Sequence, residues 1–313
     1  MYRAHMTSRE AAPRRSAPLG FASRHPRLGA ALGAIAISQS SPLAKLSGGS
    51  PAAVTLYRGL FALPFLALIA RREGHSASRR DRALALVAGG LFALDLQCFH
   101  TSIPLLGVGL ATVVPNAQVL IVGALAALSG ERTPGRAIIA LPFAFAGLAL
   151  LARVVDPFSG GGVAVRSAGS DPLLGVIWGI GAASFYALYL VITRRISVGS
   201  DAVGPFGMLR DAAVGMIAVS LLIALVDGSV ILAEPWPGYA WLLLLALLSQ
   251  VLGYPLINAS IPKLPSVVGS VLLFVQPIMT LVVGVLIFGE LPTLGQLLGA
   301  GLLFGGVLIA ARR

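Results

Sequence analysis

The sequence predicts an all-α polytopic membrane protein of ten transmembrane helices, arranged as two inverted five-helix repeats. Three observations predict this fold class: the composition, ten apolar stretches of membrane-spanning length, and an internal repeat. Of the 313 residues, 57% are hydrophobic and only 11% are charged, and the mean hydropathy is +0.88. A soluble domain usually carries about 25% charged residues. A core that hides so much apolar surface is hard to build at this length, so lipid is the predicted solvent.

Each apolar stretch has roughly the 20 residues that a helix needs to cross about 30 Å of hydrocarbon. The stretches are 28–46, 51–70, 83–103, 105–129, 135–153, 172–192, 203–226, 238–260, 264–288 and 292–311. Stretch 28–46 is the weakest, because Ser38-Gln39-Ser40-Ser41-Pro42 interrupts it. Residues 1–27 are polar and rich in Arg, which favours a disordered cytoplasmic tail over a transit or signal segment.

The positions of the Lys and Arg residues test this division into ten spans. If the N-terminus is cytoplasmic, most of the 23 Lys and Arg fall in loops on the inner side, as the positive-inside rule requires. Only Lys45, Arg153 and Arg166 fall outside, and Arg58 and Arg210 lie within spans. We therefore predict an inner (plasma) membrane protein with both termini cytoplasmic. The same placement explains the net charge of +11 without nucleic acid, since basic stripes interleaved with exposed aromatic residues are missing.

An internal repeat relates the two halves of the chain. Residues 99–118 align without gaps with residues 257–276, and Ser-Ile-Pro and a glutamine recur at matching positions, so that Gln118 corresponds to Gln276. Gly-Glu recurs shortly afterwards at Glu131 and Glu290, and Arg58 in the second span corresponds to Arg210 in the seventh. Recurrence of these polar residues is far less expected by chance than recurrence of apolar ones.

The period of the repeat is five spans, which is odd, so the second copy enters the membrane upside down. The predicted units are the repeats 28–153 and 172–313, joined by a flexible external linker, 154–171. Inverted repeats are typical of secondary transporters, whose substrate sites lie near the midplane between the repeats. Two such halves can open a cavity first to one side and then to the other, which predicts alternating access.

The segments GLATVVPNAQVLIVGALAALSGER (109–132) and VLLFVQPIMTLVVGVLIFGE (271–290) resemble the paired signatures of the EamA-like branch of the drug/metabolite transporter superfamily. The resemblance covers about residues 28–311. It implies that spans one to four and six to nine surround a central cavity. It also implies transport of a small polar or amphipathic metabolite, such as an amino acid or a drug-like solute, with export as one open direction.

Polar side chains near the midplane are the candidate solute ligands, because they are costly in hydrocarbon unless they face a cavity. Gln118 and Gln276 lie roughly 18–20 Å deep, and an amide both donates and accepts hydrogen bonds. Asn116 and Gln39 are further candidates. The alternative for all four is hydrogen bonding between helices without a ligand.

Aromatic and charged residues within spans complete the predicted site. Trp178 and Tyr186 are candidates for the cavity lining, with helix packing as the alternative. Arg58 and Asp95 fall at similar depths, roughly 10–12 Å below the outer edge, which predicts an ion pair; the alternative is that Arg58 extends outward and Asp95 finds other donors. Gly253 stands at the position equivalent to Asp95 in the second half, and this asymmetry makes Asp95 the candidate for coupling a proton or a cationic solute. Arg210 needs another partner, because the adjacent Asp211 points about 100° away on the helix.

Two further features of the sequence have structural interpretations. Glu131 and Glu290 each precede a helix, whose dipole favours a nearby carboxylate. Helix 292–311 contains Gly295/Gly299 and Gly301/Gly305 at the GxxxG spacing for close helix approach, which leaves a homodimer as an alternative.

Other classes of function lack sequence support. An intramembrane enzyme would need a catalytic motif such as HExxH or GxSxG, and an ATP-driven pump would need a P-loop; the chain contains none of these. The single Cys98 offers no disulfide framework or metal constellation, and no cofactor is predicted. A channel or facilitator is the main alternative, because it too lines a polar path through the membrane. The expected partners are a small-molecule solute and the lipid bilayer.

Overall fold

The computed structural model describes residues 20–73, 77–128, 135–151, 170–199, 205–229, 236–264 and 266–311. Within these ranges all regular secondary structure is helical. The first half contains α1 (Gly20–Arg24), α2 (Pro26–Ser38), α3 (Ser40–Leu46), α4 (Pro51–Glu73), α5 (Arg79–Leu106), α6 (Val108–Ala111), a 3₁₀ turn (Val114–Ala117), α7 (Gln118–Leu128) and α8 (Gly135–Leu151). The second half contains α9 (Pro172–Gly199), α10 (Pro205–Asp227), α11 (Gly238–Leu245), a π-helical segment (Ala246–Gly253), α12 (Tyr254–Ser260), a 3₁₀ turn (Ile261–Lys263), α13 (Ser266–Leu273), α14 (Val275–Phe288) and α15 (Leu294–Ala311).

Six helical runs in the described ranges are long and apolar enough to cross a membrane. They are Pro51–Glu73, Arg79–Leu106, Val108–Leu125, Pro172–Ile196, Pro205–Asp227 and Gly238–Ser260. The apolar helices Ile139–Leu151, Val275–Phe288 and Leu294–Ala310 are shorter. Large apolar side chains such as Leu128, Val226 and Leu286 are almost fully exposed, as expected of a surface that lipid covers. The chain is therefore built as a polytopic membrane protein, whereas the count of ten spans and the inverted repeat stay predictions.

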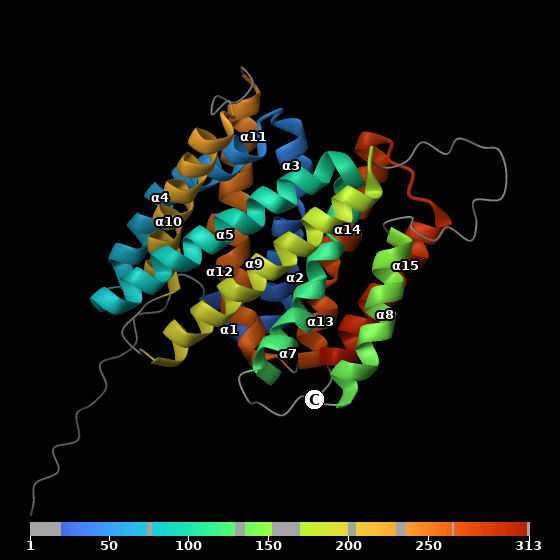
Figure 1. Ribbon diagram of the computed structural model, residues 1–313. Coiled ribbons are helices and arrows are strands. Elements are labelled where there is room, and N and C mark those ends of the chain that lie inside the picture. Colours follow the sequence, from blue (N-terminus) through green and yellow to red (C-terminus); the bar gives the residue numbers. More distant parts are fainter. Residues whose placement is uncertain are drawn as a thin grey trace, which may run out of the picture.

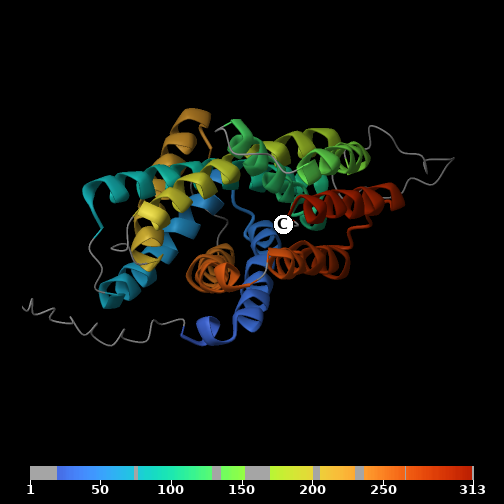
Figure 2. The same cartoon turned by 90° about the horizontal axis from the view of Figure 1, so that it is seen from below.

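The helices form two groups on either side of a central set (Figure 1). On one side α4, α5 and α10 pack together, and α9 lies along α5; on the other side α8 and α15 form a separate pair. Seen from below, α2 passes between α12 and the segment α13–α14 (Figure 2). Helices from the two halves of the sequence are thus interleaved, and the first half does not form a bundle of its own.

Glycines set the closest crossings. A Cβ on Gly89 of α5 would collide with the backbone of Ala212 on α10, and a Cβ on Gly215 of α10 would collide with the backbone of Leu86. At Gly299 of α15, a Cβ would lie 2.7 Å from the carbonyl oxygen of Gly147 on α8. Gly299, which the sequence suggested for a homodimer, is therefore used within the chain. The small residues let the backbones approach, as is usual in membrane bundles.

Two spans break where prolines remove backbone donors. The helix of residues 26–46 is interrupted at Gln39, and Pro42 has no N–H to donate to the carbonyl of Ser38, four residues earlier. The hydroxyl of Thr280 on α14 donates to this carbonyl instead, at 2.9 Å. In the span 108–128, the turn before Pro115 is closed by Asn116, whose side-chain Nδ2 donates to the carbonyls of Thr112 (2.9 Å) and Val113 (3.1 Å). Side chains thus satisfy the backbone groups that the breaks release.

Some predicted boundaries differ from the structure. Residues 20–27 were predicted as part of a disordered tail, but Gly20–Arg24 is helical and α2 begins at Pro26. The reason is apolar contact: Ala22 is fully buried, and α1 packs against α2 and α12. Most of the predicted linker 154–171, together with Glu131, lies outside the described residues. At its end, the backbone N–H groups of Ser170 and Asp171 donate to carbonyls at the end of α5.

Candidate functional site

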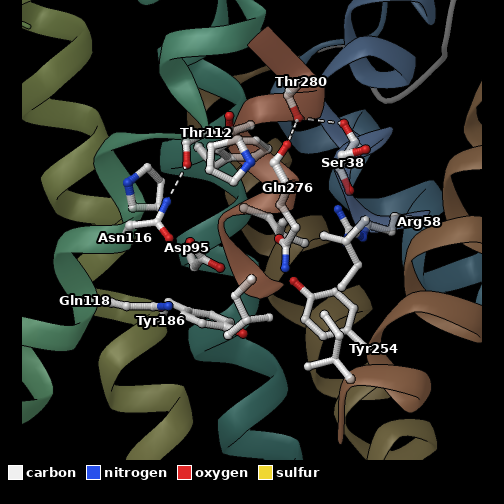
Figure 3. A pocket seen from close by; sticks show the side chains of 18 residues that line it. Ser38, Arg58, Asp95, Thr112, Asn116, Gln118, Tyr186, Tyr254, Gln276 and Thr280 are labelled. Carbon is white, nitrogen blue, oxygen red and sulfur yellow. Dashed lines mark hydrogen bonds between the residues drawn. The ribbon is translucent and has the colours of Figure 1, made fainter. Parts of the chain in front are cut away.

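A cavity of about 160 Å³ lies where the interrupted helices meet (Figure 3). Its walls come from α2, α3, α4, α5, α9, α12 and the spans 108–128 and 266–288. The span 266–288 is interrupted at Phe274, between α13 and α14, and we call 108–128 and 266–288 the broken spans. Gln118 is about ten residues from either end of its span, and Gln276 has a similar place in the other, so both lie roughly 15 Å from a span end. The cavity is therefore near the middle of the helical layer.

The structure brings six of the nine predicted site residues to this cavity. They are Gln118, Gln276, Asn116, Tyr186, Arg58 and Asp95. Figure 3 shows them on two facing walls, with Asn116, Asp95, Gln118 and Tyr186 on one side and Gln276 and Arg58 on the other. The Oε1 atom of Gln118 is buried and has no hydrogen-bond partner, although the rest of the residue is partly accessible. A buried acceptor without a donor is costly, so a solute that donates a hydrogen bond to this atom would relieve that cost.

Three predicted residues do not line the cavity. Gln39 lies at the break between α2 and α3, where its Nε2 donates to the hydroxyl of Ser38 at 3.0 Å, and the neighbouring Ser38 and Ser40 reach the cavity instead. Trp178 lies on α9 with 37% of its surface exposed, away from the lining. Arg210 is also outside it.

Arg210 corrects a prediction. Asp211 was expected to be a poor partner because successive residues diverge on a helix, yet Arg210 Nη2 lies 2.6 Å from Asp211 Oδ1 and Nε donates to the same oxygen at 2.7 Å. The long arginine side chain folds back along the helix surface, so the angle between the Cα–Cβ bonds does not prevent contact. Arg58 and Arg210 occupy corresponding positions in the repeat but have different partners.

Arg58 is held by neutral groups. Its side chain is 1% exposed, and Nε and Nη2 donate to Oε1 of Gln250 at 3.3 and 3.2 Å. The rings of Phe92 and Tyr254 each lie 5.8 Å from the guanidinium carbon, within the range of cation–π attraction. Nη1 is buried, and no group of the described residues bonds to it. Gln250 belongs to the π-helical segment, whose extra residue per turn turns this amide toward Arg58.

The predicted ion pair between Arg58 and Asp95 is not formed as a direct contact. Both residues are described, both line the cavity, and no nitrogen–oxygen distance between them falls within 4 Å among the ion pairs of the described residues. They interact through space, without a hydrogen bond. Gln250 takes the place near Arg58 that the sequence assigned to Asp95.

Several residues that line the cavity were not predicted from the sequence. Ser38, Thr112, Tyr254 and Thr280 contribute polar atoms to the cavity wall. Thr280 lies one helical turn after Gln276 and on the same face, so the spacing of four residues could have predicted that it lines the cavity. Tyr254 follows the π-helical segment, so no regular helical period places it on the cavity face.

A cluster of polar contacts closes one end of the broken spans. The carboxylate of Glu290 accepts hydrogen bonds from Lys45 Nζ (2.8 Å) and from the backbone N–H groups of Val108 (2.8 Å) and Gly109 (3.3 Å). Lys45 Nζ also lies 4.6 Å from the ring centre of Phe288. Glu290 had been interpreted as favouring the start of its own next helix, but its carboxylate binds the start of α6 in the other half. We call Lys45, Glu290 and the start of α6 the clasp.

The cavity can bind by hydrogen bonds, aromatic contact and charge. No group of three or more His, Cys, Asp or Glu side chains in the described ranges could hold a metal ion. The lining therefore supplies groups for binding a solute.

Residues 173–312 match the model of the EamA-like transporter family, which belongs to the drug/metabolite transporter superfamily. The family that the sequence predicted is thereby confirmed, on the second of the two predicted repeats. Together with the long apolar helices, this match supports a multi-pass membrane transporter.

A solved crystal structure, with the printed title "Crystal structure of protein", superimposes with a TM-score of 0.55. The alignment covers 92% of this chain and 96% of that chain at 20% sequence identity, so the likeness concerns the fold alone. No curated protein matches the sequence.

Proposed function

We propose that this EamA-like transporter is a secondary carrier that moves a small polar or amphipathic metabolite across the inner membrane by alternating access. The solute would bind in the cavity between Gln118 and Gln276. The observation that carries the proposal is a polar cavity at mid-depth, walled by interrupted helices, which is where secondary transporters place their substrates.

The lining supports a site between two related halves. The alignment of residues 99–118 with 257–276 makes Gln118 equivalent to Gln276 and Pro115 equivalent to Leu273, and all four line the cavity. The same alignment pairs the lining residues Phe99 and Ile257, and its continuation without gaps toward the N-terminus pairs Leu96 with Tyr254. A cavity on the axis that relates two repeats is expected to draw its walls from equivalent positions.

The helix contacts support the same relation. The packing of α5 against α9 is matched by α12 against α2, and the packing of α7 against α9 is matched by α14 against α2. The pairs α4–α10 and α8–α15 join equivalent spans directly. This pattern is the one that an approximate twofold axis in the membrane plane produces, so it favours inverted repeats.

The clasp is the contact that would close the outer end of the cavity during alternating access. By the charge pattern, Lys45 and Glu290 lie at the outer end, where α6 packs against α14: a Cβ on Gly109 would lie 2.6 Å from Leu281. The outer halves of the two broken spans are thus held together in this conformation. We propose that release of the clasp opens the cavity to the outside, with both chain termini in the cytoplasm.

The polar atoms of the lining favour a solute with several hydrogen-bonding groups, such as an amino acid or a drug-like amphiphile. A channel is the second candidate, because it would use the same lining. The clasp favours a carrier, since a closed end is a state that alternating access requires.

A ligand screen followed by flux measurement tests the proposal. Purified protein is heated with amino acids, nucleosides, sugars and cationic drugs, and a solute that binds only the native state raises the midpoint of unfolding. We expect a ligand whose affinity falls at least about tenfold in Gln118→Ala and Gln276→Ala, which is the loss of about 1.4 kcal/mol of binding, with unchanged unfolding of the free protein. Trp178→Ala, outside the cavity, is the matched control.

In proteoliposomes the same solute should show saturable uptake that is accelerated by internal solute. Flux that does not saturate would favour the channel. Equal losses of affinity in Trp178→Ala and in the glutamine variants would overturn the assignment of the site.

A further inference from the structure

Asp95 is a carboxylate at the wall of the cavity, and no residue that the structure describes bonds to it. It lies in the middle of α5, and 6% of its surface is exposed. Among the described residues, no side chain or backbone N–H donates a hydrogen bond to it, and no ion pair includes it. Its oxygens are not among the fully buried atoms, so the small exposed part of the side chain faces the cavity that it lines.

Arg58 does not neutralise this carboxylate by contact. Its donors are directed to Gln250, and the rings of Phe92 and Tyr254 flank the guanidinium. Arg58 therefore supplies an attractive field but leaves the oxygens of Asp95 without a proton donor. The counter-charge is fixed in place, and the hydrogen-bonding positions of the carboxylate remain open.

As far as the structure describes the chain, the other elements around Asp95 supply no further charge that is free to pair with it. Tyr186 and Tyr189 of α9, Tyr254 of α12 and Cys98 of α5 itself interact with it electrostatically, and all are neutral groups at physiological pH. On α10, Arg210 and Asp211 pair with each other, and Asp227 at the helix end accepts a hydrogen bond from the backbone N–H of Ser229; Lys45 of α3 is bound in the clasp. Within the described residues, a partner for the oxygens of Asp95 must therefore come from the cavity.

An ionised carboxylate that is nearly buried and not hydrogen-bonded is costly, and such groups in membranes mark ion or proton pathways. We propose that Asp95 is the cation-binding site of the cavity, which a proton and an ammonium group of the solute occupy in turn. The proton binds a carboxylate oxygen in one state. It leaves to water in the cavity when an ammonium group takes its place, so that each state has one positive charge at Asp95.

The second repeat has no counterpart of the carboxylate of Asp95. The position equivalent to Asp95 in the second half is Gly253, so the cavity has one such carboxylate and one cation is exchanged in each cycle. The coupling role rests on the proposed transport. The binding of a proton to Asp95 does not, and it can be measured on the purified chain without any flux.

Labelling with dicyclohexylcarbodiimide tests the site, because this apolar reagent modifies protonated carboxyl groups in apolar surroundings. The purified full-length protein is labelled in detergent from about pH 9 to about pH 5, and the modified residue is located by mass spectrometry. We expect a label on Asp95 that changes by about tenfold per pH unit on the alkaline side of its titration. The label should be absent in Asp95→Asn and retained, on the new carboxyl, in Asp95→Glu.

Asp211→Asn is the matched control, since Asp211 is already paired with Arg210. That variant should be labelled at Asp95 like the parent. Propylammonium at millimolar concentration should slow the labelling at least several-fold, whereas equal sodium chloride should not.

Labelling that does not depend on pH, or that persists at this site in Asp95→Asn, would overturn the proton site. Equal protection by sodium would overturn the ammonium assignment, and pH-dependent labelling without protection by propylammonium would overturn the exchange. If labelling behaves as expected while no solute is transported, the proton site stands and the proposed transport fails.

Discussion

Arg58 is the largest of the side chains that are almost completely buried, and its position explains much of the site at the scale of single residues. A guanidinium in hydrocarbon needs partners, and here they are one amide oxygen and two aromatic rings. Because the acceptor is neutral, the positive charge is oriented but not cancelled. The positive field therefore extends to the cavity, where Asp95 and the solute can respond to it.

Replacing Gln250 should be more damaging than replacing an amide without a partner. We expect Gln250→Leu to lower the free energy of unfolding by roughly 1.5–3 kcal/mol, because Arg58 would keep its charge and lose its hydrogen bonds. Gln97→Leu is the matched control, since the Oε1 atom of Gln97 is buried without a partner. Thermal unfolding in detergent measures both.

The double variant Arg58→Met/Gln250→Leu should recover part of the loss, because the buried charge is removed together with its acceptor. If Gln250→Leu is no less stable than Gln97→Leu, the account of Arg58 is wrong.

The sequence alone predicted Gln118 and Gln276, because their recurrence at mid-span in the two halves can be read directly from it. It missed Gln250 for a physical reason: a π-helical segment shifts the faces of a helix, and no regular period predicts where its side chains point. Gln39 does not line the cavity for a similar reason: the helix breaks at that residue, and the serines on either side face the cavity instead.

At the scale of elements, the clasp holds three segments that are far apart in the sequence. Glu290 follows α14, Val108 begins α6 and Lys45 lies in the last turn of α3. The left-handed backbone of Gly289 (φ 63°) ends α14 and lets the chain turn back so that the carboxylate reaches α6. The recurrence of Gly-Glu in the sequence indicated a structural role for Glu290. Its partners, Lys45 and the start of α6, could not be predicted, because both contacts depend on how the two halves pack.

Weakening the clasp should open the outer end of the cavity. In a Cys98→Ala background, Thr112→Cys places a thiol in the cavity lining. We expect Glu290→Gln to raise the rate at which a membrane-impermeant maleimide labels this thiol from outside by several-fold, because the ion pair to Lys45 is lost. Intact cells and mass-shift detection give the rate.

Asp211→Asn breaks another close ion pair away from the cavity and should leave the rate unchanged. An unchanged rate in Glu290→Gln would mean that the clasp does not control access.

At the scale of the whole molecule, the exposed apolar side chains and the buried small residues have complementary roles. Lipid covers side chains such as Phe145, Leu222 and Ile287, while glycines let α5 approach α10 and α8 approach α15. Hydropathy predicted which segments are helical, because each of the ten apolar stretches overlaps helix among the described residues. It could not predict which helices are neighbours, since nearly all apolar faces look alike in lipid.

The orientation of the two halves is the central claim, because alternating access follows from their inversion. Ser76 lies in the connection between α4 and α5, and Ser229 lies in the corresponding connection after α10. Single-cysteine variants at these two positions, in the Cys98→Ala background, are treated with a membrane-impermeant maleimide before and after permeabilisation of the cells. We predict that Ser229→Cys is labelled in intact cells and Ser76→Cys only after permeabilisation, whereas labelling of both from the same side would contradict the inverted repeat.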